Sequence, residues 1–259
     1  MDSVYDIGIE MQLYGDATYH SQRQDFTAAS TPQFDSPTVT VAEDGSYTIT
    51  FGERKLLADG IAKIRSGGVA YSSDPGVNEE RLELVEITRS SFSDELGTGE
   101  RIATTWQAGD VPYVTAIRDY DDSFVVFEQE FPDGLDPAAT GAYESPITAF
   151  PCVSNESSNR NYLTFDMRHF APPRSDFAFT GAPVVGYDGD LNSFVISPLT
   201  DFFSGLTFKQ EGRLESCLEG LLEELPAGFT YETVCHFGAG INATLQEWGD
   251  LLLEYHDAE

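Results

Sequence analysis

Short apolar runs separated by turn residues dominate the chain after Pro37. The runs are rich in Val, Ile, Thr, Phe and Tyr, and Gly, Pro, Asp, Asn and Ser divide them, which is the pattern of β-strands joined by tight turns. No helical stretch of ten or more residues falls between consecutive runs, so the spacing favours an antiparallel sandwich. Strands are predicted at 38–41, 46–51, 81–88, 101–107, 112–119, 123–131, 161–166, 177–187, 193–197 and 229–237.

One predicted strand, residues 123–131, illustrates how the side chains divide between two faces. Successive side chains of a strand point to opposite sides, so alternate positions separate into an apolar face and a partly acidic one. Two carboxylates on one face lie close enough to couple their titrations, as a catalytic pair does, but a solvated strand face is the ordinary explanation. The two faces comprise Val125, Phe127, Gln129 and Phe131, and Val126, Glu128 and Glu130.

A helical pattern closes the chain. Apolar residues recur there at intervals of three and four, which places them on one side of an α-helix. Thr244 and Glu247 have the spacing of a capping box, with Asn242 as an alternative cap. We expect this helix to dock on a partner, because it carries a tryptophan on its apolar side at the end of the chain. The stripe consists of Ile241, Leu245, Trp248, Leu252 and Tyr255.

These patterns divide the chain into three parts. Residues 1–36 are polar and rich in Ser, Thr, Gln and Asp, and we interpret them as an irregular N-terminal arm. Residues 37–238 form the predicted body, a large antiparallel β-sandwich or supersandwich, and residues 239–259 form a docking or linker helix. The predicted fold class is therefore mainly β with a C-terminal α-helix.

The charge of the chain narrows the class of partner. Its 259 residues include 44 Asp and Glu but only 14 Lys and Arg, which gives a formal charge of −30. Such a surface repels a phosphate backbone, so nucleic acid is excluded as a partner. With 41% hydrophobic and 12% aromatic residues, the chain is too apolar for a disordered acidic tail. An acidic coat of this kind is typical of proteins from concentrated salt, and an ordinary acidic protein is the alternative.

The cysteine spacing and the N-terminal sequence argue against several kinds of site and segment. Cys152, Cys217 and Cys235 include no C-x-x-C pair and no set at zinc-ligand spacing, so buried free thiols are predicted. The N-terminus lacks a basic segment followed by an apolar one, and no uncharged apolar run approaches the roughly 18 residues of a membrane span. We therefore expect no signal peptide, no membrane partner and, by default, a cytoplasmic location.

Two motifs have the form of ligand-binding loops. The G-x-G-x-x-A sequence at 238–243 matches a dinucleotide fingerprint, which requires a second parallel strand, but only 259 − 243 = 16 residues follow it. Residues 188–192 begin like a calcium loop, yet Ser193 and Leu199 stand where an EF-hand has Gly and Glu. A strand-to-helix corner and a hairpin turn explain these sequences, so no metal and no cofactor are predicted.

Aromatic residues beside acidic ones suggest carbohydrate binding. Sugar sites use aromatic rings against pyranose C–H groups and carboxylates against hydroxyls, and such residues gather around two predicted strands and their turn. We take Trp106, Tyr120 and Asp121 as candidate carbohydrate-binding residues. A core position for Trp106 and a plain turn at Asp121 and Asp122 are the alternatives. The four histidines lie far apart and no nucleophile motif occurs, so no catalytic residue is predicted.

Three stretches resemble a known group of proteins. They read PVVGYDGDLNSFVISPL at 183–199, LPAGFTY at 225–231 and GAGINATLQEWG at 238–249. They are similar to the N-terminal region of large uncharacterised glycoside-hydrolase-like proteins related to the α-galactosidase and raffinose synthase clan. The resemblance implies a β-supersandwich that precedes a (β/α)₈ barrel, and the barrel supplies the acidic nucleophile and the acid/base. No residue of this chain matches those catalytic positions, and the chain ends where the first barrel strand is expected.

The functional prediction follows from this resemblance. We expect a non-catalytic, carbohydrate-associated sandwich that acts with a glycoside-hydrolase barrel absent from this chain, and that hydrolyses little or nothing by itself. One alternative is a self-sufficient glycan hydrolase that uses carboxylates of the sandwich loops, and another is a purely structural or interaction domain. The carboxylates considered for the hydrolase are Asp119, Asp121, Asp122, Glu128 and Glu130.

Overall fold

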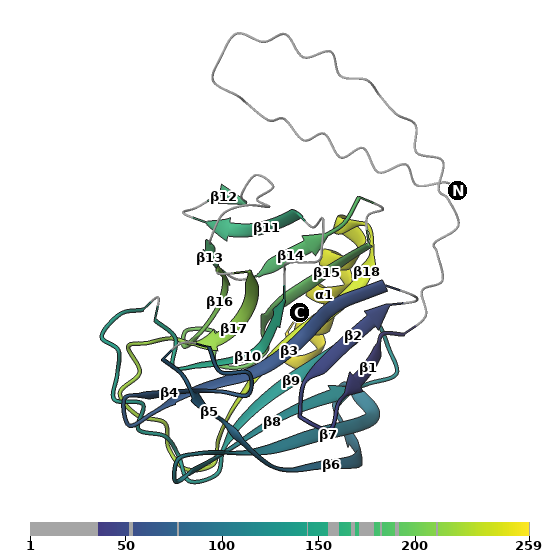
Figure 1. The fold of residues 1–259 in the computed structure, drawn as a ribbon. Coiled ribbons are helices and arrows are strands. Elements are labelled where there is room, and N and C mark those ends of the chain that lie inside the picture. Colours follow the sequence, from purple (N-terminus) through teal and green to yellow (C-terminus); the bar gives the residue numbers. More distant parts are fainter. Residues whose placement is uncertain are drawn as a thin grey trace, which may run out of the picture. The chain divides into compact units, whose positions relative to one another are not determined.

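Two β-sheets face each other in the computed structural model, and one helix packs against the second sheet (Figure 1). The structure describes residues 36–51, 54–76, 78–143, 145–154, 161–166, 169–170, 179–181, 183–189, 192–210 and 212–258. The first sheet contains β1 (Thr38–Val41), β2 (Tyr47–Phe51), β3 (Arg54–Ser66), β4 (Val69–Ser72), β5 (Glu80–Arg81), β10 (Thr148–Ser154), β13 (Phe179–Gly181), β16 (Gly205–Gln210) and β17 (Arg213–Leu218). The second contains β6 (Glu83–Asp94), β7 (Gly97–Ala108), β8 (Val111–Asp119), β9 (Phe124–Phe131), β11 (Asn161–Asp166), β12 (His169–Phe170), β14 (Val184–Tyr187), β15 (Asn192–Pro198) and β18 (Phe229–Ala239). The helix, α1, spans Ile241–Tyr255.

Strand pairing between the described strands is antiparallel, apart from the short parallel pair β4 and β5. The first sheet has the order β1-β2-β3-β10-β17-β16-β13, with β4 beside β3 and β5 beside β4. The second has the order β12-β11-β14-β15-β18-β9-β8-β7-β6. Strands β6 to β9 follow one another through tight turns, which connect only antiparallel neighbours. This arrangement confirms the predicted mainly-β sandwich with a C-terminal helix.

Strand β3 shows why part of the first sheet escapes the sequence pattern. Asp59 adopts a φ of 49°, and the register of β3 shifts against both β2 and β10. An irregularity of this kind interrupts the alternation of side chains, so Leu56, Leu57 and Ala58 are buried in succession. No strand is predicted between 51 and 81, because the period of two is lost there.

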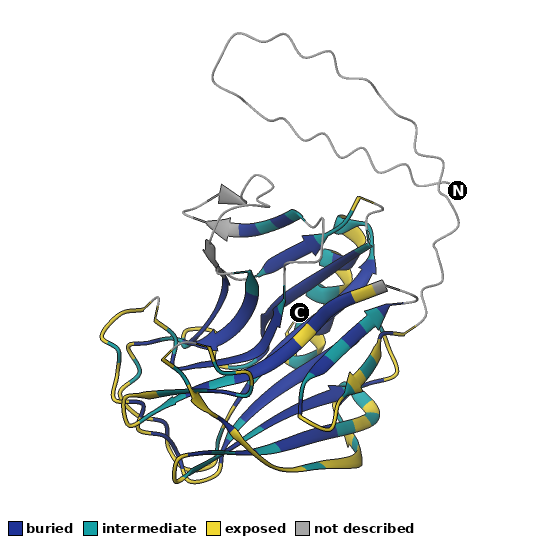
Figure 2. Cartoon of the chain, viewed as in Figure 1, coloured by how far each residue is buried: buried dark blue, intermediate teal, exposed yellow. Residues whose placement is uncertain are grey.

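Strand β6 corrects a second expectation, about which side of a strand is buried. The alternation over 81–88 predicts a buried apolar face, and Leu82, just before β6, is buried. Leu84 and Val85, however, are both exposed, because β6 forms the edge of the second sheet and pairs only with β7 among the described strands (Figure 2). Apolar side chains therefore alternate at this edge without a core beneath them.

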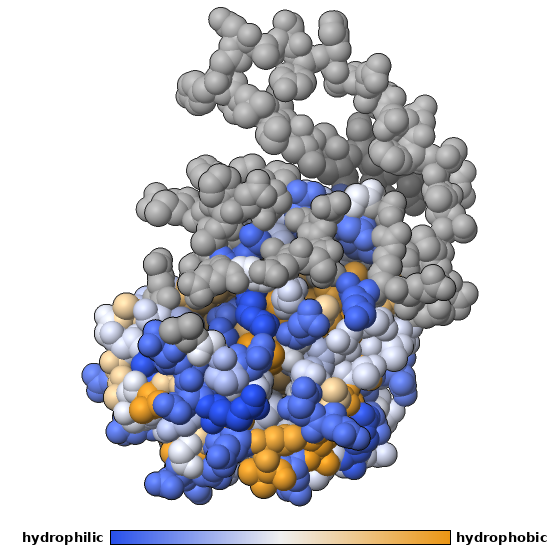
Figure 3. Space-filling model, in the orientation of Figure 1, coloured by the Kyte–Doolittle hydropathy of each residue, from blue (hydrophilic) through white to orange (hydrophobic). Residues whose placement is uncertain are grey.

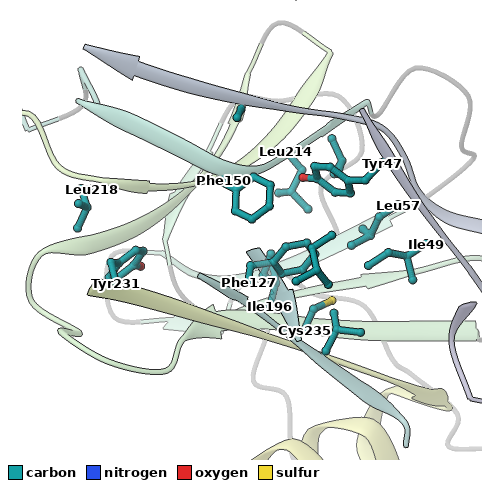
Figure 4. Packing of buried hydrophobic residues seen from close by; sticks show 14 of the residues in the cluster. Tyr47, Ile49, Leu57, Phe127, Phe150, Ile196, Leu214, Leu218, Tyr231 and Cys235 are labelled. Atoms are coloured by element: carbon teal, nitrogen blue, oxygen red, sulfur yellow. The ribbon is translucent and has the colours of Figure 1, made fainter. Parts of the chain in front are cut away.

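Aromatic side chains from both sheets meet in the core (Figure 4). Phe127 of β9 lies with its ring centroid 5.8 Å from that of Tyr47 and 5.4 Å from that of Phe150, which belong to β2 and β10 of the opposite sheet. Tyr47 and Phe150 also contact each other, at 5.3 Å. Centroid distances of this size are typical of packed aromatic pairs, so Phe127 joins the two sheets at the centre.

A buried glutamine adds a polar link between the sheets. Gln129 has no exposed surface, as its place on the apolar face of 123–131 predicts. Its Nε2 donates to the Phe150 carbonyl of the first sheet at 3.0 Å, and its Oε1 accepts from the Tyr113 hydroxyl at 2.8 Å. Because both ends of the amide are satisfied, its burial carries no unpaired polar group.

Helix α1 does not begin with the predicted cap. Gly240 is the N-cap, with a φ of 84° and no side-chain cap, so the capping box expected at Thr244 and Glu247 is wrong. Thr244 is buried instead, and its Oγ1 lies 2.7 Å from Ser193 Oγ of β15. Trp248 Nε1 donates to Ser197 Oγ at 3.0 Å. The apolar side of α1 therefore covers the chain's own second sheet, and docking on a partner stays a prediction.

The two loop motifs have the backbone roles predicted for them. Asp188 closes the β14–β15 turn, where its carboxylate accepts from the backbone and the side chain of Asn192 at 3.0 and 2.8 Å. Gly238 lies one residue before the end of β18, a strand that pairs antiparallel with both neighbours, which is incompatible with a dinucleotide fold. Cys152 and Cys217 are buried free thiols, as predicted, and Cys235 is buried in β18. The predicted arm, 1–36, lies outside the described residues except for its last position.

Removal of the central aromatic ring should weaken the sandwich. Phe127→Ala leaves a cavity between the sheets, and we expect a loss of about 3–5 kcal/mol in the free energy of unfolding, measured by urea denaturation. Val85→Ala is the control, because Val85 is 59% exposed on the edge strand, and its expected change is within about 0.5 kcal/mol. Equal effects of the two substitutions would contradict the central position of Phe127.

Candidate functional site

The outer face of the second sheet carries a cluster of charged side chains beside α1. Strands β7, β8, β9 and β18 are neighbours in this sheet, and the alternation that turns Phe127 inward turns Glu128 and Glu130 outward. The end of β6 adds a further carboxylate next to them. We call this group the Arg118 cluster, and its members are Asp94, Arg101, Arg118, Glu128, Glu130 and Glu232.

Arg118 is the centre of this cluster. Its Nη1 donates to Asp94 Oδ2 and its Nη2 donates to Glu232 Oε1, both at 2.5 Å, while its Nε lies 2.6 Å from Glu128 Oε1. Arg101 Nε donates to the other oxygen of Glu128 at 2.7 Å, and Arg101 also pairs with Glu130. Charge-assisted contacts with a planar guanidinium hold several carboxylates in fixed positions.

The cluster also fixes the end of α1. Tyr255 of the helix donates its hydroxyl proton to Glu232 Oε2 at 3.0 Å, and Tyr120 donates to Asp94 Oδ2 at 2.7 Å. Burial raises the pKa of Glu232, although Arg118 and the Tyr255 hydroxyl favour its ionised form. Burial raises the pKa of Glu130 as well, against the effect of Arg101. Four carboxylates share two arginines here, so the acids are incompletely neutralised.

This geometry corrects the interpretation of Glu128 and Glu130. We expected a solvated strand face, but the Glu128 side chain is only 8% exposed and is held by two arginines. Both carboxylates are therefore committed to ion pairs, with Glu128 buried and the Glu130 side chain 34% exposed. In the described part of the chain, the cluster holds the strands and the end of the helix in position.

The remaining acidic candidates form the β8–β9 turn. Asp119 Oδ1 accepts from the backbone N–H of Asp121, and Asp122 Oδ1 accepts from that of Ser123 at 2.6 Å. Asp121 is exposed and has a φ of 55°, a conformation that aspartate tolerates in turns. Asp121 and Asp122 therefore lie in a plain turn, which is the alternative that the sequence left open for them.

The predicted carbohydrate-binding residues do not come together. Trp106 is 1% exposed in the core, and its Nε1 donates to Thr115 Oγ1 at 2.9 Å, so its ring presents no open face to a ligand. Tyr120 lies on the outer face, against Phe92 and Phe124 at ring-centroid distances of 4.8 and 4.5 Å. The sheet separates Trp106 from Tyr120 and the adjacent Asp121. Sugar binding at Tyr120 and Asp121 stays a prediction.

A histidine on the same outer face is buried without a full set of partners. His236 Nε2 lies 3.2 Å from Ser123 Oγ, and Nδ1 has no hydrogen-bond partner in the described part. Burial lowers the pKa of His236 to about 4, in spite of the nearby Asp122. His236 is therefore neutral at pH 7. No carboxylate orients its ring at Nδ1, so the pair with Ser123 lacks the third member of a nucleophilic triad.

The first sheet holds a polar cavity that no sequence motif marks. It has a volume of about 330 Å³ and lies where β3, β4, β10 and β17 approach one another. The surface in the region of β4 and β5 is mixed, with hydrophilic residues beside hydrophobic ones (Figure 3). Four charged residues are among those that line it: Lys63, Arg65, Glu79 and Glu215.

An ion pair forms one side of this cavity. Lys63 Nζ lies 3.0 Å from Glu215 Oε1 and 4.0 Å from Glu79 Oε1, and Glu215 is buried. Burial lowers the pKa of Lys63, but the two carboxylates outweigh it and hold that pKa above its ordinary value. One feature of the sequence singles out this residue: Lys63 is one of only three lysines in the chain.

Two other kinds of functional feature, a metal-binding cluster and a membrane-spanning helix, are absent from the described residues. No group of three or more His, Cys, Asp or Glu side chains is placed there to hold a metal ion. No described helix has the length and apolarity that a bilayer crossing requires.

Comparison with known proteins identifies folds of glycoside hydrolases. No protein-family model and no curated protein matches the sequence. A glycoside hydrolase family 97 enzyme from Pseudoalteromonas sp. strain K8, in complex with panose, aligns with a TM-score of 0.53 and 13% identity over 78% of this chain. An enzyme of that family and strain in complex with acarbose gives 0.52 and 13% over 80%. An α-mannosidase from Enterococcus faecalis V583 gives 0.50 and 8% over 85%.

These similarities concern the fold, because the sequences are so different. The chain spans 36% of the family 97 enzymes and 30% of the α-mannosidase. It therefore shares its sandwich architecture with about a third of each of these larger proteins.

Loss of the central arginine should destabilise the chain through its carboxylates. Arg118→Met leaves three acidic groups without their shared cation, and we expect a loss of about 3–5 kcal/mol at neutral pH in urea denaturation. Arg89→Met is the control: Arg89 pairs with Glu100 at an exposed position, where both side chains are about half exposed, and its loss should cost less than about 1 kcal/mol.

The pH dependence of Arg118→Met gives a second readout. Glu232 has a raised pKa in the folded chain, so protonation favours folding and stability falls as the pH rises through that pKa. Arg118 lowers the pKa of Glu232, so removal of Arg118 raises that pKa further. The fall in stability with rising pH is then larger. The deficit of the variant should therefore shrink between about pH 7 and about pH 4. A deficit independent of pH would point to lost packing instead of unpaired carboxylates.

Proposed function

We propose that the chain is a non-catalytic, carbohydrate-associated β-sandwich that acts with a glycoside-hydrolase barrel. The observation that carries the proposal is the fold similarity to two kinds of glycoside hydrolase, of which the chain spans only about a third. The chain shares its architecture with one part of such enzymes. We therefore assign it an accessory role beside the part of the enzyme that it does not span.

The chemistry of the sandwich supports the non-catalytic half of the proposal. Glycoside hydrolysis needs two carboxyl groups that flank a substrate, one of them free to attack or to activate water. Among the acids considered for this task, Glu128 and Glu130 are bound to arginines, and the aspartates of the β8–β9 turn accept backbone hydrogen bonds. Their arrangement stabilises the sheet and its turn.

The carbohydrate half of the proposal comes from two independent sources. Two family 97 structures contain panose and acarbose, and the stretches at 183–199, 225–231 and 238–249 resemble the α-galactosidase and raffinose synthase clan. The relationship to that clan rests on the sequence resemblance alone. Because the resemblance to that clan implies a (β/α)₈ barrel, we take the partner to be a barrel domain or subunit.

The purified chain should not hydrolyse glycosides. In assays with p-nitrophenyl α- and β-glycosides, we expect no turnover above that of a heat-denatured sample, because Glu128 and Glu130 are bound to arginines and Asp119 and Asp122 accept backbone hydrogen bonds in a turn. Glu130→Gln and Asp122→Asn are the comparison variants. Turnover that either substitution abolishes would refute the accessory role and establish a self-sufficient hydrolase.

The gene should encode, or lie beside, the catalytic partner. Sequencing the DNA downstream of codon 259 is expected to reveal a continuing or adjacent reading frame with the alternating strands and helices of a (β/α)₈ barrel. Co-purification of the two products would then test their association directly. Neighbouring genes without any glycoside hydrolase barrel would favour the purely structural alternative.

A further inference from the structure

His236 lies beneath the middle of helix α1. Farther along β18, a Cβ atom at Gly238 would be only 2.5 Å from Thr244 Oγ1, near the start of the helix. In the other direction, Val234 belongs to the same apolar cluster as Leu251 of α1. Alternate residues of a strand share one face, so His236, midway between Gly238 and Val234, points toward the helix. Because only 4% of His236 is exposed, α1 shields its ring from water.

The two strands beside His236 place apolar side chains on either side of its ring. Its partner on β15 is Val195, and its partner on β9 is Phe124, whose ring is stacked with the imidazole at a centroid distance of 6.4 Å and an angle of 9°. Nε2 lies 3.2 Å from Ser123 Oγ, and Nδ1 has no hydrogen-bond partner among the described residues. One ring nitrogen is therefore satisfied, and the other is buried without a partner.

Carboxylates approach the ring from two elements without reaching Nδ1. Asp122 lies in the β8–β9 turn and interacts electrostatically with His236. Glu247 of α1 has its Oε2 3.5 Å from the Cβ position of Gly238, and it interacts with Asp122 and with Asp250. Both Asp122 and Glu247 are exposed, so water solvates their charges. Burial outweighs the attraction of Asp122 and lowers the pKa of His236, so the ring stays neutral at pH 7.

A proton added to His236 would change how the helix is held. In the imidazolium form both ring nitrogens are donors, and the donor at Nδ1 would be buried under α1 with no acceptor among the described residues. A buried charge and an unpaired buried donor both cost free energy. Movement of α1 away from β18 admits water to the ring and removes both costs. Acid therefore favours an open position of the helix over the closed one.

We propose that His236 is a pH-sensitive switch for α1, in which protonation of the imidazole beneath the helix loosens the helix from β15 and β18. The element with two states is α1 itself, which opens locally while the sandwich stays folded. In the closed state, Thr244 and Trp248 hold the helix through Ser193 and Ser197. The proposal concerns the attachment of the helix, and it goes beyond the accessory role without depending on it.

Hydrogen exchange of the α1 backbone amides in the whole chain tests the switch. Protection is measured at about pH 7 and about pH 5.5 and corrected for the intrinsic pH dependence of exchange. An exposed histidine has a pKa of about 6.5, and the closed state lowers the pKa of His236 to about 4. Through His236, opening of α1 should become about eightfold more favourable at the lower pH. Glu232 and Glu247 have raised pKa values and oppose this effect, so it is measured against variants that keep both carboxylates.

Two variants remove the proton and one control keeps it. His236→Phe leaves a flat ring beside Phe124 that cannot be protonated, and His236→Gln, which retains a donor for Ser123, covers the case in which phenylalanine does not fit. The loss of α1 protection on acidification should be about eightfold larger in the wild type than in either variant. His256→Gln is the matched control, because His256 is exposed just beyond α1, with Nε2 3.1 Å from the Leu199 carbonyl. It should behave as the wild type.

Three results would overturn the switch. The first is the same pH dependence of α1 protection in the wild type and in both His236 variants. The second is loss of that pH dependence in His256→Gln, which would assign the effect to the end of the helix. The third is equal protection of the α1 and β8 amides, because the helix would then open only when the whole chain unfolds. None of these results bears on the accessory role, which glycoside turnover by the chain would refute separately.

Discussion

Contact between the inner faces of the two sheets is the constraint on which the structure depends. Every strand that supplies Phe127, Tyr47 or Phe150 to this contact must turn its alternate residues away from the core. The core therefore determines the outer faces as well. On β9 the inward aromatic ring leaves Glu128 and Glu130 facing out, and they then require partners wherever another element covers them.

That requirement explains the Arg118 cluster. Helix α1 lies over part of the second sheet and shields the neighbouring outer positions from water, which makes an unpaired carboxylate expensive. Arg118 meets three acids there, and Tyr255 ties the end of the helix to one of them, Glu232. Arg101 and Arg118 are thus placed where acids are buried, whereas Arg89 and Glu100 pair at an exposed position where both groups stay solvated.

Local patterns predict the parts of this fold that local physics controls. The alternation at 123–131 identifies the buried face of β9 correctly, including Gln129, because the period of two survives along that strand. It does not identify β3, where the irregularity at Asp59 breaks the period. Helix periodicity finds α1 but misplaces its cap, since Gly240 and the packing of Thr244 on β15 decide where the helix begins.

The candidate site lies beyond the reach of such patterns for a different reason. Lys63 and Glu215 are 152 residues apart and become neighbours only because β10 pairs with β3 on one side and with β17 on the other. Trp106 is the opposite case: its residue type suggests a sugar platform, but its position on the inner face of β7 places it in the core.

The two charged groups of the sandwich are alike in what they leave available to a ligand. In the Arg118 cluster every nitrogen of the central guanidinium lies within 2.6 Å of a carboxylate oxygen. On the first sheet, Lys63 Nζ lies 3.0 Å from Glu215 and 4.0 Å from Glu79. A polar ligand at either place competes with an ion pair, and a charge-assisted contact is stronger than a hydrogen bond between neutral groups. Both groups therefore hold the strands that carry them together.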